Sequence, residues 1–172
     1  MHTPVYATLL LLLASVPFAQ RQASMPGELQ RVRLIDGAQS VEMRDSVASR
    51  KSHLGVPSSK QYFIFDGPKA LIRTRNATPV IQFDLEPEYD DEVYLFKFDK
   101  HSDSREIRVA KGLGSLAELS IPKDHLIPST LEQIGAGKNS AKRYRLKPNA
   151  PLRPGEYCLS RNLSDCFDFG VD

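Results

Sequence analysis

The sequence of 172 residues has no tryptophan, only two cysteines and almost no excess of charge, with 23 lysines and arginines against 21 aspartates and glutamates. A charge balance this even gives no support for nucleic acid as a partner. No segment shows helical periodicity over any length, so we expect only short helices, near Ser115–Leu119 and Ser129–Gln133. A domain rich in turns fits the 12 prolines and 10 glycines better than a helical one.

The motifs of common enzymes are also missing. No serine lies in a G-x-S-x-G motif, and neither cysteine has a base beside it. His53, His101 and His125 are widely separated and lie in polar segments. Asp168–Gly170 spells the magnesium-binding triplet of kinases, but the other kinase motifs are absent, so we interpret it as part of a last strand. The sequence gives no positive support for catalysis, and we expect no cofactor.

The N-terminal segment indicates export. Residues 1–20 carry no charged side chain, and five leucines at 9–13 are followed by mostly small residues up to Ala19. This pattern predicts a signal peptide at 1–19, a polar leader at 20–28 and a secreted or periplasmic protein that uses the general secretory route. The run is shorter than the ~20 apolar residues of a spanning helix, and no later segment could cross a membrane. A retained N-terminal anchor is the alternative.

Residues 29–172 alternate apolar and polar side chains in short segments. The apolar positions with period two are Val32 and Leu34, then Ile81, Phe83 and Leu85, then Ile107 and Val109, then Tyr144 and Leu146. Such alternation is typical of strands with one buried face. We therefore expect an all-β fold, a single-domain antiparallel β-sandwich or open barrel of about eight or nine short strands.

Two Asp-Gly pairs predict hairpins. Asp36-Gly37 and Asp66-Gly67 each stand between apolar segments, where glycine accepts the positive φ of a tight turn. Between these hairpins, residues 45–60 are polar and rich in turn formers. This segment is predicted to be a long exposed loop.

The two cysteines suggest a disulfide in a terminal hairpin. Cys158 and Cys166 are placed symmetrically about Asn162, so pairing them would oppose Leu159 to Asp165 across a short loop. Oxidising compartments preserve such a bond, which would stabilise the fold by about 2–3 kcal/mol. If the cysteines face each other, Tyr157, Leu159, Phe167 and Phe169 lie together on the opposite face of the hairpin. We expect that apolar face to point into the core and the disulfide to lie on the outer face. Two free thiols acting in redox or metal chemistry are the alternative.

Two charged segments are candidate sites. An acidic segment holds the clustered oxygen ligands that hard cations prefer, at Glu86, Glu88, Asp90, Asp91 and Glu92. It lacks the spacing of a calcium loop, and a solvated turn is the alternative interpretation. Arg143, Arg145 and Lys147 alternate along one predicted strand and could contact an anionic surface, although any solvent-facing strand can look the same.

The C-terminal part resembles an uncharacterised group of exported bacterial proteins with a "PGEY…DFGV" ending. The resemblance covers roughly residues 60–172. It is carried by "YLFKFDKHSDSREIRVAKG", "PLRPGEYCLS" and "FDFGVD", with "FDGPKA" and "TPVIQF" upstream. It implies an exported, bacterial and β-rich protein, and it implies no catalytic activity.

These observations together predict an exported, non-enzymatic β-domain with an interaction or envelope-associated role. Its partner would be a protein or an envelope component. The alternative is a hydrolase or carbohydrate-active protein on a β-sandwich scaffold. That function would require carboxylates from distant loops, such as Asp91 and Asp103, to converge in one cleft.

Overall fold

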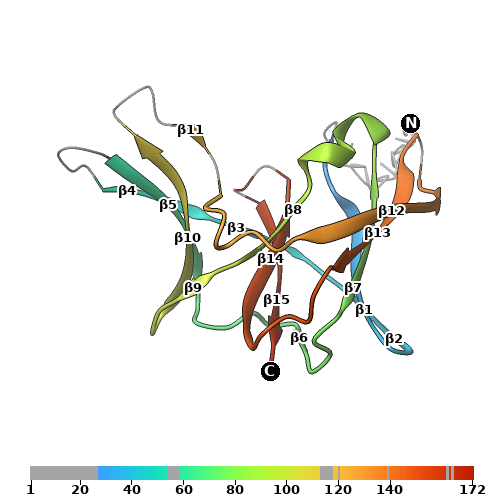
Figure 1. The fold of residues 1–172 in the computed structure, drawn as a ribbon, viewed down its shortest axis with the longest axis horizontal. Coiled ribbons are helices and arrows are strands. Elements are labelled where there is room, and N and C mark those ends of the chain that lie inside the picture. The colour runs from blue at the N-terminus through green and yellow to red at the C-terminus, as the bar shows by residue number, and fades with distance from the viewer. Residues whose placement is uncertain are drawn as a thin grey trace, which may run out of the picture.

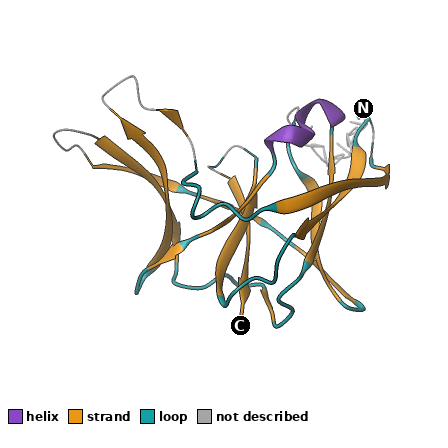
Figure 2. Cartoon of the chain, viewed as in Figure 1, coloured by secondary structure: helices purple, strands orange, loops and turns teal. Residues whose placement is uncertain are grey.

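The computed structural model describes residues 27–53, 59–112, 118–119, 121–138, 140–161, 163 and 165–172. Over these residues the chain is all-β, with a single 3₁₀ helix, η1 (Pro87–Glu92), as its helical element (Figures 1 and 2). The predicted signal peptide at 1–19 lies outside the described residues, as does most of the polar leader.

The strands form three sheets, each of them open at its edges. Sheet A has the order β12 (Ser129–Ala136), β13 (Lys142–Pro148), β7 (Val80–Leu85), β1 (Gln30–Asp36), β2 (Gln39–Glu42). Sheet B has the order β3 (Asp45–Val47), β15 (Asp165–Val171), β14 (Gly155–Ser160), β8 (Tyr94–Lys97), and β6 (Arg73–Thr74) pairs parallel to β15. Sheet C has the order β11 (Glu118–Leu119), β10 (Ser104–Gly112), β5 (Ser59–Asp66), β4 (Ser49–His53), and β9 (Asp99–Lys100) pairs with β10.

Sheet B is the middle layer of the molecule, with sheet A on one side and sheet C on the other (Figure 1). The first core, between sheets A and B, contains Val32, Leu34, Ile81, Phe83, Leu85, Leu95, Tyr144, Leu146, Tyr157, Leu159, Phe169 and Val171. The second core, between sheets B and C, contains Phe63, Phe65, Phe96, Phe98, Ile107, Val109, Cys158 and Cys166. The all-β sandwich class is therefore confirmed, in a form with three layers.

Strands β14 and β15 are buried on both faces. On β14, Tyr157 and Leu159 point into the first core while Cys158 points into the second. On β15, Phe169 points into the first core and Cys166 points into the second. Sequence reasoning expected strands with one buried face, which holds for β1, β7 and β13 but not for the middle layer.

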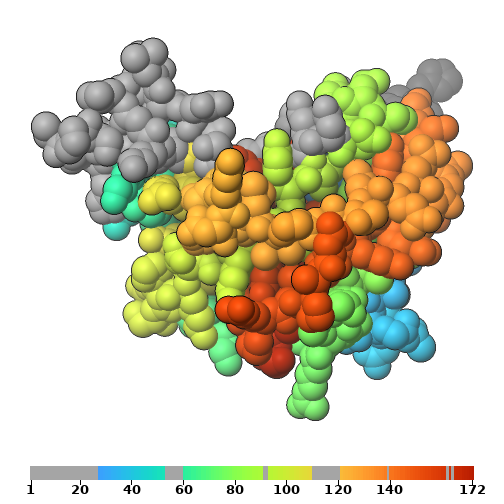
Figure 3. Space-filling view, viewed as in Figure 1, coloured from blue at the N-terminus to red at the C-terminus, as the bar shows by residue number. Residues whose placement is uncertain are grey.

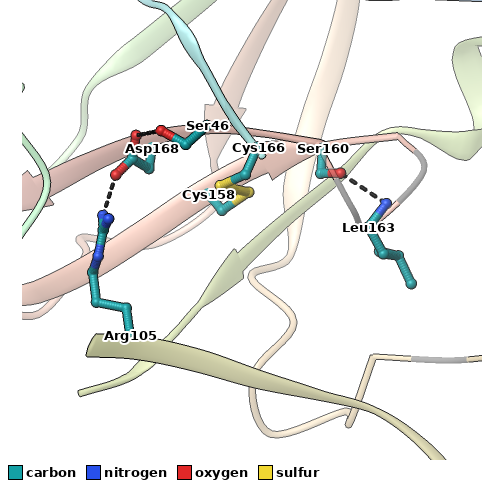
Figure 4. Close-up of a disulfide and its surroundings, with 7 residues drawn as sticks. All are labelled: Ser46, Arg105, Cys158, Ser160, Leu163, Cys166 and Asp168. Carbon is teal, nitrogen blue, oxygen red and sulfur yellow. Dashed lines mark hydrogen bonds and ion pairs between the residues drawn. A yellow bond between two sulfur atoms is a disulfide. The ribbon is translucent and has the colours of Figure 1, made fainter. Parts of the chain in front are cut away.

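The disulfide between Cys158 and Cys166 is present, but its predicted surroundings are wrong. Both cysteines are 0% exposed and lie in the second core, not on an outer face (Figure 4). The register also differs, because Leu159 pairs with Phe167 and Cys158 pairs with Asp168. The bond therefore joins diagonal neighbours of the hairpin. The apolar residues share one face as predicted, and the opposite face is covered by sheet C.

Charged groups on the middle layer are neutralised inside the protein. Asp168 on β15 accepts hydrogen bonds from Ser46 and from Arg105 on β10, so this ion pair connects sheets B and C (Figure 4). Glu156 on β14 accepts hydrogen bonds from the amide of Ala70 at 2.8 Å and from Nη1 of Arg73 at 2.9 Å. A buried carboxylate needs such partners, because it has lost its hydration.

One segment, residues 121–128, which we call the strap, crosses the front of the molecule from sheet C to sheet A (Figures 1 and 3). It follows the free edge of β8: the amide of Lys97 donates to the carbonyl of His125, and the amide of Ile127 donates to the carbonyl of Leu95. The strap thereby covers an edge strand that could otherwise pair with another chain.

The first predicted hairpin is confirmed and the second is wrong. Strands β1 and β2 pair antiparallel around Gly37, whose φ is 58°. At Asp66-Gly67, β5 instead pairs with β10 and β4, and no strand follows directly. The guanidinium of Arg105 binds the carbonyls of Asp66 and Gly67. This long-range contact, together with the one from Glu156 to Ala70, holds the following residues in a loop.

Three further expectations need correction. The helix expected near Ser129–Gln133 is strand β12, which pairs with β13 along its length. The long loop predicted at 45–60 contains β3 and β4, although its side chains are mostly exposed and residues 54–58 lie outside the described part. The described residues form 15 strands where the sequence predicted eight or nine, because several edge strands are only two to four residues long.

We predict that replacing Cys158 and Cys166 by serine destabilises the protein more than replacing both by alanine. Both pairs lose the disulfide, but each serine hydroxyl left without a partner in the second core costs about 1–3 kcal/mol more. Urea unfolding of the two double variants measures the difference. Equal stabilities of the serine and alanine pairs would place the disulfide on a solvated face, as the sequence alone suggested.

Candidate anion-binding face

The outer face of sheet A, on the side away from the first core, carries a group of basic side chains. Arg33, Gln82 and Arg145 are direct cross-strand partners on β1, β7 and β13. Because neighbouring strands are about 4.8 Å apart, this row places two guanidinium groups on either side of one amide. Arg143 and Lys147 flank Arg145 on the same face of β13, because side chains on a strand alternate.

Asp84 organises the basic side chains at one end of this face. Its side chain is 1% exposed, although it lies on the outer side of β7 between Phe83 and Leu85. Its carboxylate accepts hydrogen bonds from Nε of Arg31 at 2.7 Å and from Nε of Arg143 at 3.0 Å. The two arginine side chains are 45% and 40% exposed, so they cover the carboxylate and meet solvent themselves.

A β-bulge brings Arg31 to this position. The pairing of β1 with β7 shifts between Gln30 and Arg33, so two residues of β1 stand opposite one of β7. Arg31 has a φ of 50°, in the left-handed region that a residue other than glycine rarely adopts. The ion pair with Asp84 is the contact that holds this strained residue in place.

The turn between β12 and β13 closes over Asp84. The amide of Lys138 donates a hydrogen bond to the carboxylate at 3.2 Å. Gly137 allows this approach, because a Cβ there would lie 2.9 Å from the carbonyl oxygen of Ala141 and 3.0 Å from Cγ of Asp84. At Gly135, near the end of β12, a Cβ would meet nothing within 4 Å.

These contacts set the ionisation of Asp84. Burial raises the pKa of its carboxyl, but the hydrogen bonds from Arg143 and Arg31 lower it by more, so the pKa lies below the ordinary value of 3.8. Asp84 is therefore an anion at neutral pH, and it fixes two cations without neutralising both of them.

A pocket of about 150 Å³ opens beside Asp84 on this face. It is lined by Arg31, Arg33, Gln82, Phe83, Asp84 and Arg143. Arg33 is exposed and has no ion pair among the residues described. Three guanidinium groups against one carboxylate give the pocket a formal charge of +2, so the ligand it suits is an anion.

The sequence located part of this face. Arg143, Arg145 and Lys147 do lie on the outer side of β13, where Lys147 is exposed and the two arginines are partly exposed. Arg143 is bound to Asp84, and Arg145 lies 3.8 Å from Glu132. Sequence reasoning missed Arg31, Arg33 and Asp84. Their signal was present: arginines alternate in "RVRL" as they do in "RYRL", and Asp84 interrupts an apolar strand.

Two residues of the acidic candidate segment accept hydrogen bonds from other parts of the fold. Glu86 accepts a hydrogen bond from the amide of Gly27, and Asp90 accepts one from the phenol of Tyr144 at 3.1 Å. Burial and this bond to Asp90 raise the pKa of Tyr144. Glu88, Asp91 and Glu92 lie in the same helix, η1. Within the described residues, no group of three acidic, histidine or cysteine side chains is arranged to hold a metal ion.

The two residues named for the hydrolase alternative lie in segments at different places in the fold. Asp91 lies in η1, at the top of the view in Figure 1, while Asp103 lies in the turn between β9 and β10, at the lower end of sheet C. His101 pairs with Glu106 at 3.1 Å, and His125 lies between Asp99 and Asp124. For His53 the side-chain position is outside the described part.

A second, larger pocket of about 380 Å³ lies between the strap and residues 149–153. Its walls are largely apolar, from Ile127, Pro128, Pro151, Leu152 and Tyr157, with Lys97 at one side. The ammonium of Lys97 lies 3.4 Å from the carbonyl of Pro154 and 5.8 Å from the centre of the Tyr157 ring. Asp124 and Arg153 also line this pocket, so two cations stand against one carboxylate and its formal charge is +1, lower than the +2 beside Asp84.

Comparison with protein-family models, curated proteins and solved structures finds no match to this chain. Among the described residues, no helix has the length and apolar character required to span a membrane.

We predict that Asp84→Asn destabilises the protein by about 1.5–3 kcal/mol at neutral pH, the usual contribution of hydrogen bonds to a charged group. Because folding lowers the pKa of Asp84, its contribution is present above pH 3.8 and is lost as the pH falls through the lowered pKa. The difference in free energy of unfolding between wild type and variant should therefore become smaller only in strong acid. Chemical unfolding across this pH range measures it.

Glu132→Gln is the matched control for this prediction. Glu132 lies on β12, is 59% exposed and, among the described residues, forms one ion pair, the long contact to Arg145. Its replacement should change stability little at any pH. A difference for Asp84→Asn that stays constant down to strong acid would show that the charge of Asp84 is not what stabilises this face.

Proposed function

We propose that this protein is an exported, non-enzymatic β-domain that associates with a polyanionic component of the cell envelope through the outer face of sheet A. The observation that carries the proposal is the set of cations on that face. Arg33 and Lys147 are exposed, and Arg143 and Arg145 are partly exposed beside them. With Arg31 they are five cations on this face, against Asp84 and against Glu42 and Glu132, the cross-strand partners of Arg33 and Arg145, so the face keeps an excess of two positive charges.

The character of the face favours a polyanionic surface over a protein partner. Protein interfaces usually have an apolar or aromatic centre. No exposed large apolar side chain lies on β1, β7 or β13, all of which are described in full. Attraction between an open basic face and a surface of fixed negative charge needs no such centre.

Export is supported by two features. The N-terminal segment has the pattern of a signal peptide. The disulfide between Cys158 and Cys166 is a bond that persists in oxidising compartments. Because both cysteines lie in the second core, the bond also adds stability there, outside the cell's reducing interior.

We predict that the protein binds vesicles containing phosphatidylglycerol and does not bind neutral phosphatidylcholine vesicles. Arg145→Glu combined with Lys147→Glu should weaken this binding by at least about thirtyfold, since each cation near an anionic surface contributes about 1 kcal/mol. Sedimentation with vesicles, repeated at increasing salt, measures the binding.

Lys51→Glu combined with Lys60→Glu is the matched control. It makes the same change of charge at exposed positions of sheet C and should leave vesicle binding nearly unchanged. Equal losses for the two double variants would mean that net charge, and not this face, drives binding. Failure of the wild-type protein to bind anionic vesicles at low salt would contradict the proposed function.

A further inference from the structure

We propose that the pocket beside Asp84 binds the phosphate group of a phosphate monoester. This inference rests on the proposed function, because it names the chemical group that the basic face of sheet A recognises. It depends on three features of the pocket: the hydrogen-bond donors that remain free, the net charge and the size.

Asp84 orients the guanidinium groups of Arg31 and Arg143 but binds only some of their N–H donors. Asp84 is bound through Nε of Arg143 and through Nε and Nη2 of Arg31. Both terminal nitrogens of Arg143 and Nη1 of Arg31 have no hydrogen-bond partner within the described parts of the chain. Arg33 and the amide of Gln82 add further donors at the rim. Several converging N–H groups suit an oxyanion with three or four acceptor oxygens.

The charge of the pocket distinguishes between anions. Arg31, Arg33 and Arg143 carry three positive charges against the single negative charge of Asp84. A phosphate monoester carries about −1.5 to −2 at neutral pH and compensates the remaining charge of +2. A carboxylate ligand, with one negative charge, would leave a cation unpaired.

The size of the pocket limits what enters it. At about 150 Å³ it is smaller than the roughly 300–1,000 Å³ of sites that enclose a whole small molecule. A single oxyanion fills such a space, and the rest of the ligand would stay on the open face of the sheet. The site therefore recognises a group, either on a lipid head or as free phosphate.

Asp84 acts as a positioning residue in this pocket. Its buried carboxylate fixes the guanidinium groups of Arg31 and Arg143 before any ligand arrives. Side chains that are ordered in advance lose less conformational entropy on binding. The carboxylate itself is covered by those two arginines and by the amide of Lys138, which limits its repulsion of the ligand.

Titration of the folded protein with inorganic phosphate, followed by calorimetry and by NMR, tests the inference. We expect saturable binding, and about a tenfold loss of affinity in Arg33→Gln, the effect of one charge-assisted hydrogen bond. Arg33 is exposed and forms no ion pair in the described structure, so this variant keeps its fold. Arg145→Gln removes an equal charge from the same face outside the pocket and should change the affinity by less than about twofold.

Two outcomes would overturn the inference: no binding of inorganic phosphate, or equal losses in Arg33→Gln and Arg145→Gln. If the wild-type protein still binds phosphatidylglycerol vesicles, either outcome would refute phosphate binding in the pocket but not the proposed function. If the wild-type protein also fails to bind these vesicles, both proposals would be refuted.

A second arm identifies the source of the phosphate. Vesicles of phosphatidic acid, a monoester, are compared with phosphatidylglycerol vesicles, a diester, at matched surface charge. Preference for phosphatidic acid that inorganic phosphate abolishes assigns the pocket to a lipid head. Phosphate binding without that preference assigns it to a soluble phosphate. If the pocket binds a lipid head, the Arg33→Gln variant must lose the preference for phosphatidic acid. A variant that keeps this preference would contradict the assignment to a lipid head.

Discussion

The fold depends on a middle layer that is buried on both faces. Strands β14 and β15 supply Tyr157, Leu159 and Phe169 to one core and Cys158 and Cys166 to the other. Sheets A and C each have a solvent-facing side, so neither could form a closed core without this layer. The buried carboxylates of β14 and β15, Glu156 and Asp168, must therefore be paired inside the protein. Arg73 and Arg105 supply those partners from the surrounding segments.

The same requirement explains the candidate site on sheet A. Asp84 lies on a strand whose inner face fills the first core, and its carboxylate, on the outer face, is 1% exposed. Arg31 and Arg143 satisfy it from the two neighbouring strands. The bulge at Arg31 and the close turn at Gly137 are the local distortions that allow this contact. A structural ion pair thereby leaves a rigid group of arginines facing solvent.

Sequence periodicity predicted which residues share a face of a strand, but not how many layers the fold has. Val32, Leu34, Ile81, Phe83, Tyr144 and Leu146 were placed correctly, because sheet A has one polar side. Cys158 was placed on the outside, because a cysteine on the face opposite the apolar residues gives no sign of a second sheet. The Asp66-Gly67 hairpin failed for a related reason: Arg105 and Glu156, distant in sequence, determine the path of that loop. Likewise, Asp84 and the arginines around it come from three segments, and sequence reasoning identified only the residue on β13, Arg143.

Native-state hydrogen exchange tests the central role of sheet B most directly. If both cores depend on the middle layer, the amides of β14 and β15 should exchange most slowly and only through global unfolding. Amides in β5 and β10 of sheet C and in β1 and β7 of sheet A should exchange at the same rate or faster. Slower exchange in either outer sheet than in β14 and β15 would show that this sheet keeps its structure without the middle layer, and would contradict the account.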